Sequence, residues 1–261
     1  MSPLGRWWRT RVLERERSRL DPETWARVWE SLPLLDDLSE AEASRLDDLA
    51  LLFLRDKRLD PAQGLDLTEP MRIAIALQAC LPILALGLDW YRGWYAVIVY
   101  PDEFVPEREV MGDDGVVWIE REAKSGEAWE QGPVILSWAD VEAGQERDGY
   151  NVVIHELAHK LDMLDGAANG CPPLHAGMSP QRWAAVFSAA YDDLCRRVDA
   201  HEETAIDPYA SESPAEFFAV ASESFFERPD LLQADYAELY EQLVAFYRQD
   251  PLARLLATEP R

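Results

Sequence analysis

Hydrophobic residues recur at helical intervals in the first part of the chain. Asp21 is followed by a proline, and Ser39 and Glu42 have the spacing of a capping box, so helices are expected to begin near residues 22 and 40. Four apolar residues of the second helix share one face, namely Leu46, Leu49, Phe53 and Leu54. The pattern predicts that this helix buries one face in a core.

The longest apolar stretch runs from Ile73 to Leu88 and is interrupted by Gln78 and Pro82. A helix that crosses a bilayer needs about 20 consecutive apolar residues. This stretch is too short and too interrupted for that, so it predicts a buried pair of helices and no membrane span.

The middle of the chain is rich in β-branched and aromatic residues. Three short runs are bounded by proline, glycine or aspartate, and they cover residues 95–100, 116–119 and 134–138. They predict one small sheet of three or four strands.

Helical patterns return from Asn151 onward. One helix is expected over residues 151–164, and Ser-Pro pairs at 179 and 213 start two more, the second ending near Phe226. A last helix is expected over residues 231–247. Helices, then a small sheet, then helices predict an α+β fold that is mostly helical with one small β-sheet.

The charge balance excludes one class of function. The 261 residues include 25 Lys and Arg against 49 Asp and Glu, which gives a formal net charge of −24. A surface this acidic repels phosphates, so direct nucleic-acid binding is not expected.

The length favours a single domain with an accessory segment. Residues 1–20 carry six arginines and two glutamates and are interpreted as a basic N-terminal arm, and residues 21–261 as the domain. No apolar run follows this basic start, so a signal peptide is not expected. The three cysteines are widely spaced, which favours a reducing, cytoplasmic location.

The most informative pattern is His155-Glu156-Leu157-Ala158-His159. Residues four apart lie on one face of a helix, so both imidazoles can reach one metal ion. The glutamate beside the first histidine can contact a water on that ion without binding the metal itself. Zinc-dependent hydrolysis needs these parts: a metal that lowers the pKa of water and a carboxylate that accepts its proton.

The pattern alone leaves the third ligand open. Asp165 lies at a metzincin-like spacing, but the glycine that lets the chain turn back is missing. No glutamate occurs between Glu156 and Glu202, which removes the thermolysin-like spacing. Glu216, on the helix expected after Ser213, is either a ligand or the partner of Ser213 in a capping box.

Other polar residues are candidates for supporting roles. Glu223 is a further ligand candidate, but it and Asp162 are better suited to accept the free ring N–H of a histidine ligand. Tyr209 is a candidate hydrogen-bond donor to a developing oxyanion, although a tyrosine in a loop is more often a packing residue. Three further residues outside any ligand spacing are interpreted as ordinary surface or packing residues: Cys171, His175 and His201.

The chain resembles the Mlc titration factor A family, which are zinc metallopeptidases of the gluzincin type. Residues 155–162 share the resemblance with several further stretches, namely residues 80–84, 86–90, 100–105, 131–138, 207–210, 215–220 and 222–223. It covers roughly residues 25–255 and leaves out residues 1–20.

The resemblance implies roles for five residues. His155, His159 and Glu216 match the family's zinc ligands, Glu156 matches its catalytic glutamate, and Tyr209 matches the tyrosine that faces the zinc. It also implies a zincin-like fold similar to the catalytic domain of anthrax lethal factor, aminopeptidase-like activity, and an association with the glucose-responsive repressor Mlc.

Two functional hypotheses follow. The first is a cytoplasmic zinc aminopeptidase with one Zn²⁺ per chain and a peptide substrate, which regulates glucose-uptake genes through a Mlc-like repressor. The second is a regulatory protein that sequesters such a repressor, with the peptidase site secondary. A purely structural zinc site is the weakest interpretation, because such sites close all four positions with protein ligands.

Overall fold

The computed structural model describes residues 3–102, 107–111, 117–121, 126–128 and 132–258. Helices dominate the described part, which agrees with the predicted α+β class. They are α1 (Pro3–Arg17), α2 (Pro22–Glu30), α3 (Glu40–Asp56), α4 (Glu69–Cys80), α5 (Trp138–Ala143), α6 (Val152–Asp162), α7 (Pro180–Asp199), α8 (Pro214–Glu227), α9 (Pro229–Asp235), α10 (Ala237–Tyr247) and α11 (Pro251–Thr258).

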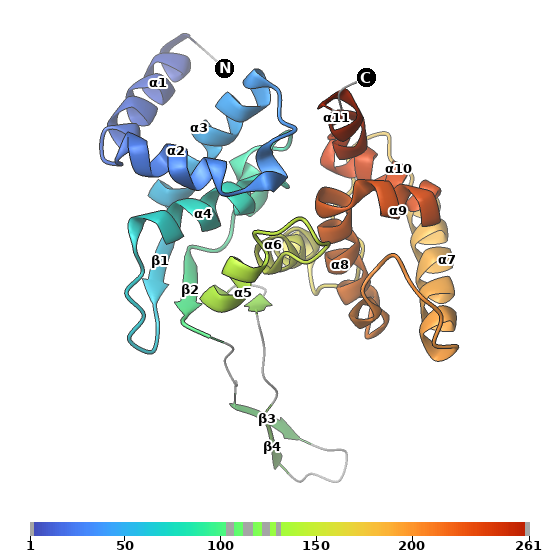
Figure 1. The fold of residues 1–261 in the computed structure, drawn as a ribbon. Helices are drawn as coiled ribbons and strands as arrows, with labels where there is room; N and C mark the ends of the chain where they lie inside the picture. Colours follow the sequence, from blue (N-terminus) through green and yellow to red (C-terminus); the bar gives the residue numbers. More distant parts are fainter. Residues whose placement is uncertain (1–2, 103–106, 112–116, 122–125, 129–131, 259–261) are drawn as a thin grey trace.

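Two groups of helices flank the centre of the molecule. The first four helices lie together at one end, α7 to α11 lie at the other, and α6 lies between them (Figure 1). Ten of the eleven residues of α6 are buried, and its apolar side chains have exposed fractions of 3% or less. The helix that carries the two histidines is therefore a central part of the core.

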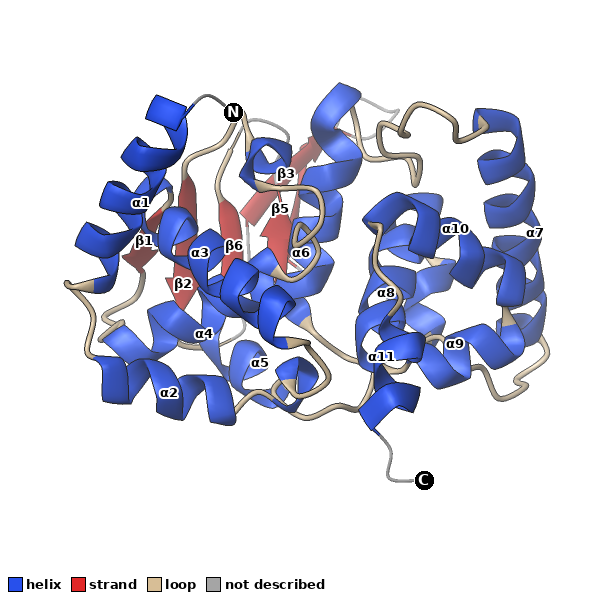
Figure 2. Cartoon of the chain, turned by 90° about the horizontal axis from the view of Figure 1, so that it is seen from above, coloured by secondary structure: helices blue, strands red, loops and turns tan. Residues whose placement is uncertain are grey.

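The main sheet has four strands in the order β1-β2-β6-β5 (Figure 2). Strands β1 (Arg58–Pro61), β2 (Ala96–Tyr100) and β6 (Val134–Ser137) are parallel, whereas β5 (Gly126–Ala128) is antiparallel to β6. Val97 of β2 lies opposite Leu59 of β1 and Val134 of β6, and all three side chains are buried.

The prediction of one small sheet is wrong in one respect. The run at 116–119 contributes to β4 (Val117–Arg121), which pairs only with β3 (Glu107–Met111) in a separate two-stranded sheet. Strand β1 was not predicted, because its sequence Arg-Leu-Asp-Pro has neither the length nor the composition of a strand. It forms because β2 offers it a partner.

Two predicted helices differ from the structure. The stretch from residue 73 to 88 contains one helix, α4, and not a pair. After Cys80 the chain turns at Pro82 and at Gly87, whose φ is +91°. The predicted helix over residues 231–247 is divided into α9 and α10 at Tyr236, which has φ −133° and ψ 61° and whose hydroxyl donates to Asp193 at 3.1 Å.

The starts of several helices confirm the capping signals. Asp21, Ser39 and Ser213 cap α2, α3 and α8, and Ser39 and Glu42 form both halves of a capping box. Residues 3–17 form helix α1, and Arg17 lies 3.6 Å from Asp48 of α3. The division into an arm and a domain at residue 20 stays a prediction.

Within the described ranges, none of the helices combines the length and the apolar character that crossing a bilayer requires.

Candidate metal centre

Helix α6 places both histidines on one face. Asn151 starts the helix, because its side-chain oxygen accepts a hydrogen bond from the backbone N–H of Ile154 at 3.0 Å. The Nε2 atoms of His155 and His159 lie 3.2 Å apart, and their ring centroids are separated by 4.8 Å. The predicted spacing therefore brings the two imidazoles to one point.

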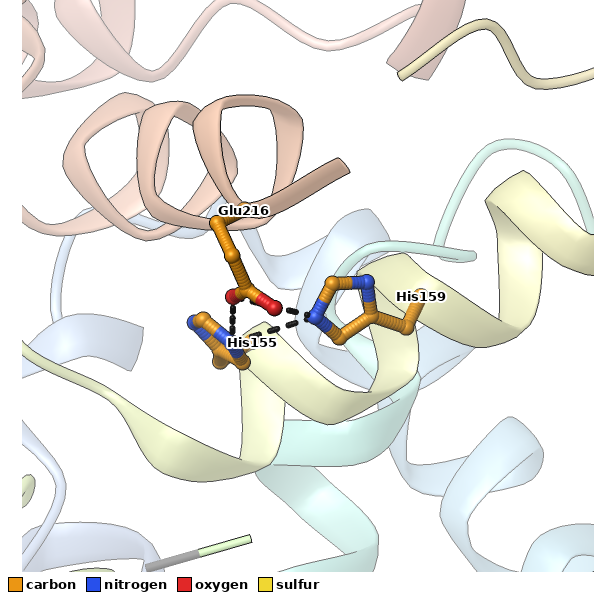
Figure 3. Close-up of side chains that lie close together, drawn as sticks. All are labelled: His155, His159 and Glu216. Carbon is orange, nitrogen blue, oxygen red and sulfur yellow. Dashed lines mark hydrogen bonds and ion pairs between the residues drawn. The ribbon is translucent and has the colours of Figure 1, made fainter. Parts of the chain in front are cut away.

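Glu216 reaches the same point from the first turn of α8 (Figure 3). Its Oε2 atom lies 3.0 Å from Nε2 of His155 and 3.4 Å from Nε2 of His159. Ser213 caps α8 through the backbone N–H of Glu216, at 3.1 Å. The backbone of Glu216 thus serves the cap while its carboxylate points toward the histidines.

These three side chains fit a divalent metal ion. They form the one group of potential ligand residues found within the described ranges, with their donor atoms within 4.8 Å of one another. Tetrahedral bonds of about 2.0–2.1 Å to zinc would place such donors about 3.3 Å apart, close to the observed separations. Lone pairs that converge in this way need a cation or a proton between them.

Glu223 orients His155 from two turns further along α8. The Oε1 atom of Glu223 lies 2.8 Å from Nδ1 of His155, so a proton on Nδ1 leaves the Nε2 lone pair for a metal. Burial lowers the pKa of His155, but Glu223 and Glu216 outweigh that effect and hold this pKa well above its usual value. Glu223 therefore has the contact expected of a supporting residue.

Asn151 connects this pair to a wider network that the sequence analysis missed. Its backbone N–H donates to Oε2 of Glu223 at 2.6 Å, and its side-chain amide donates to Gln78 of α4 at 2.8 Å and to Glu227 of α8 at 3.0 Å. All four residues are buried. In the sequence, Asn151 looks like any other residue that caps a helix, as the serines do. Its contacts with Glu223, Gln78 and Glu227 become visible only in the tertiary structure.

Glu227 gives the network a dependence on pH. Burial raises the pKa of Glu227 from 4.5 to about 8, and the hydrogen bond from Asn151 opposes this shift only in part. Since the folded-state pKa is raised, Glu227 destabilises the fold as pH increases from about 4.5 to about 8. The native chain should lose up to about 1.4 kcal/mol of unfolding free energy per pH unit in this window. Glu227→Gln should remove that contribution, and urea unfolding of both proteins at pH 5, 6.5 and 8 measures the difference. Identical pH profiles would contradict this account.

Asp162 does not make the contact predicted for it. Its Oδ2 atom accepts hydrogen bonds from the backbone N–H groups of Asn169 and Gly170, each at 2.7 Å. Its Oδ1 atom and Nδ1 of His159 are both buried and have no hydrogen-bond partner in the described part of the chain. Asp162 anchors the loop after α6 and forms no hydrogen bond with His159.

That loop brings the end of α6 against the start of α8. Gly170 has φ +80°, and a Cβ atom added there would lie 2.4 Å from the carbonyl oxygen of Pro214. The carbonyl of Gly170 also accepts a hydrogen bond from Trp183 of α7 at 3.0 Å. Because Pro214 lies two residues before Glu216, this contact fixes the position of Glu216 relative to the histidines.

Gly170→Ala should therefore weaken metal binding. A methyl group cannot fit without moving the first turn of α8, and the positive φ adds strain of about 1 kcal/mol. We expect zinc affinity at least about tenfold lower, measured by competition with a chromogenic chelator. Gly177→Ala is the matched control, since Gly177 also has positive φ, at +99°, but has no heavy atom within 4 Å of an added Cβ. Equal zinc affinities in the two variants would contradict the claim that Gly170 sets the position of Glu216 relative to the histidines.

Glu156 lies beside the first histidine and is almost fully buried, with an exposed fraction of 4%. Its Oε2 atom has no hydrogen-bond partner in the described ranges. Burial raises the pKa of Glu156, and the charges of His155 and His159 oppose that effect. A buried carboxylate beside two imidazoles, with one oxygen unpaired among the described residues, has the environment expected of a proton acceptor.

Tyr209 lies at the edge of the same site. It belongs to a short 3-10 helix, Pro208–Ser211, and its ring centroid is 6.2 Å from that of His155. The side chain is 54% exposed, so it is not a core residue. Tyr191 of α7 donates to the carbonyl of Ser211 at 2.9 Å and anchors this segment.

The remaining candidates lie elsewhere. His175 lies 2.8 Å, through its Nε2 atom, from the carbonyl oxygen of Phe246, and His201 is exposed in a turn. Asp165 is exposed after α6, and Cys171 is a free, partly buried cysteine. None of these four belongs to the group of residues described above as potential metal ligands.

Comparison with known proteins identifies the family. The model of the family described as glucose-regulated metallo-peptidase M90 matches residues 4–248. The chain belongs to the M90 family. It is 42% identical over 236 residues to Mlc titration factor A of Cronobacter sakazakii, covering 88% of this chain and 89% of that protein. It is 41% identical over 228 residues to Mlc titration factor A of Yersinia pestis, covering 86% and 84%.

M90 membership confirms the resemblance and indicates a metallopeptidase, and therefore a metal. The trio of His155, His159 and Glu216 is a group that can bind one. The match also corrects the expected coverage: it begins at residue 4, so it includes α1, whereas the sequence analysis left residues 1–20 outside the resemblance.

Proposed function

We propose that this chain is a zinc-dependent aminopeptidase that binds one Zn²⁺ through His155, His159 and Glu216. The convergence of their three donor atoms, 3.0–3.4 Å apart at the centre of the fold, carries the proposal. The Cys-free set of two imidazoles and a carboxylate is typical of catalytic zinc sites, which keep a position open for water or substrate.

Zinc held by His155, His159 and Glu216 would lower the pKa of a water molecule and polarise a peptide carbonyl. The protein residues do the rest. Glu156 accepts a proton from the attacking water and passes it to the leaving amine. One buried oxygen of Glu156 has no hydrogen-bond partner among the described residues, which supports this role.

Tyr209 supplies the second electrostatic contribution. Its exposed side chain lies beside His155, where the hydroxyl would donate a hydrogen bond to the oxyanion that forms on the substrate carbonyl. Glu223 keeps His155 in the tautomer that presents Nε2 to the metal.

The preference for a free N-terminus rests on the resemblance and on charge. A chain with 49 acidic and 25 basic residues attracts a substrate α-ammonium group. Three free cysteines accord with a reducing, cytoplasmic location.

A substrate panel tests the proposed activity. The zinc-loaded protein should hydrolyse aminoacyl p-nitroanilides, fail on the N-acetylated forms and on an internally quenched endopeptide, and lose activity with a chelator. Hydrolysis of the blocked substrates at equal rates would contradict an aminopeptidase, and activity that persists after complete metal removal would contradict the metal mechanism.

A second function is suggested by the name of the relatives, Mlc titration factor A. We propose that this chain also binds a Mlc-like transcription repressor. If such binding survives both chelation and Glu156→Gln, its contact surface is separate from the metal centre. If either change abolishes binding, the repressor contacts the metal site itself.

A further inference from the structure

A cavity lies on the β1 side of the molecule, away from the metal centre. Its volume is about 510 Å³, within the range of small-molecule sites. It is formed by the end of α3, the first residues of β1 and β2, and one residue of α4, and none of its lining residues belongs to α6 or α8. In Figure 1, β2 and α6 lie between β1 and α8.

The walls of this cavity carry an unusual charge for this chain. Four cationic residues and one acidic residue, Asp56, are among those that line it; the cations are Arg55, Lys57, Arg58 and Arg72. The chain as a whole has about twice as many acidic as basic residues. A concave surface with cations in excess attracts anions that the rest of the surface repels.

Arg72 is held ready for a ligand. Its Nη1 atom donates to the backbone carbonyl of Leu59 at 2.8 Å, which fixes the guanidinium, and the side chain is partly buried. Within the described ranges the other guanidinium nitrogens have no hydrogen-bond or ion-pair partner. An arginine anchored in this way offers a preorganised pair of N–H donors, the geometry that binds phosphate oxygens.

Lys57 adds a buried positive charge. Its Nζ atom donates to the carbonyl oxygens of Tyr91 and Trp94 and lies 3.8 Å from the centre of the Trp94 ring. The side chain is 6% exposed, and no carboxylate lies within ion-pair distance of it in the described part of the chain. Burial lowers the pKa of Lys57 to about 8. Its Nζ atom also lies 5.9 Å from the centre of the Tyr95 ring, so its charge lies close to the cavity that Tyr95 lines.

The other two cations are already engaged. Arg55 pairs with Asp56 and Arg58 with Asp60, each at 2.6 Å, and these pairs are solvent-exposed. Three of these four residues, Arg55, Asp56 and Arg58, line the cavity together with Arg72. Ion pairs of this kind are weak, at about 0–1 kcal/mol, so they compete little with a dianion.

Tyr95 provides an apolar surface beside these charges. It lines the cavity and is 76% exposed, the highest value among the exposed large hydrophobic residues of the described part. An exposed aromatic ring next to clustered cations can stack against the organic part of a ligand. The cavity is also larger than an inorganic anion needs.

We propose that this cavity binds a small phosphate monoester, with Arg72 contacting the phosphate, Tyr95 contacting the organic group, and the buried charge of Lys57 behind Tyr95 adding to the attraction. The site is independent of the metal centre and of the peptidase activity proposed above.

Calorimetric titration of the full chain with adenosine monophosphate, inorganic phosphate and adenosine tests this proposal. Titrations with and without a chelator separate the site from any binding to zinc. We expect one adenosine monophosphate per chain with a dissociation constant below about 1 mM in both conditions, weaker binding of phosphate, and none of adenosine.

Three variants sharpen the test. Arg72→Gln should lower the affinity for both adenosine monophosphate and phosphate at least about tenfold. Tyr95→Ala should lower the affinity for adenosine monophosphate but not that for phosphate. Arg182→Gln removes the same charge from α7, outside the cavity, and should leave both affinities unchanged. Because Tyr95 is exposed, its variant reports on the site even if Arg72→Gln fails to fold. Absence of saturable binding, or equal weakening by Arg72→Gln and Arg182→Gln, would overturn the proposal.

Discussion

Glu156→Gln is expected to reduce the turnover of an aminoacyl p-nitroanilide by about 10²–10⁴-fold while metal content stays at that of the native protein. Glutamine has nearly the same shape but accepts no proton, and Glu156 is not one of the three converging donors. The effect should appear in kcat with little change in KM, because the lost interaction belongs to the transition state.

Glu241→Gln is the matched control for this variant. Glu241 is exposed on α10, so the same change of charge is made away from the site. Its turnover should equal that of the native protein. Undiminished turnover in Glu156→Gln, with its metal retained, would refute the role of Glu156.

Glu216→Ala is expected to have the second large effect, on the metal itself. The variant removes one of three donors, so zinc affinity should fall by more than the roughly 10–100-fold caused by losing a residue that only supports a ligand. Turnover should fall to background at zinc concentrations that saturate the native protein. Helix α8 should remain intact, because Ser213 caps it through the backbone of Glu216 and not through its carboxylate.

Glu223→Gln provides the graded comparison. It contacts His155 at Nδ1 and no other converging donor, so its zinc affinity should fall between those of the native protein and Glu216→Ala. Equilibrium dialysis with metal analysis measures all three. If Glu216→Ala retains native affinity, or Glu223→Gln has the larger effect, the assignment of Glu216 as a ligand is wrong.

The parts of the fold predicted from sequence are those determined by local chemistry. Ser39, Ser179 and Ser213 cap helices in the structure as their spacing indicated. Strands β1 and β5 were missed because they are short and lack strand composition, and they form only through pairing with β2 and β6. The break at Tyr236 has no signal in the periodicity, since the apolar pattern continues through it.

The candidate site also has a part that local sequence determines and a part that only tertiary packing determines. The arrangement of His155 and His159 follows from helical geometry alone. Glu216 has the spacing of both a cap and a ligand, and only the packing of α8 on α6 shows where its carboxylate points. Asp162 was predicted to support His159 because both lie on one helix, but the loop at Gly170 brings two backbone N–H groups to its Oδ2 atom instead.

The central claim is that His155, His159 and Glu216 together hold a zinc ion. X-ray absorption at the zinc edge, recorded on the protein loaded with one equivalent of Zn²⁺, tests it most directly. The first coordination sphere should contain nitrogen and oxygen only, at about 2.0–2.1 Å, with the outer-shell signature of two imidazoles, and Glu216→Ala should lose that spectrum. A sulfur ligand at about 2.3 Å, or a spectrum with fewer than two imidazoles, would contradict it.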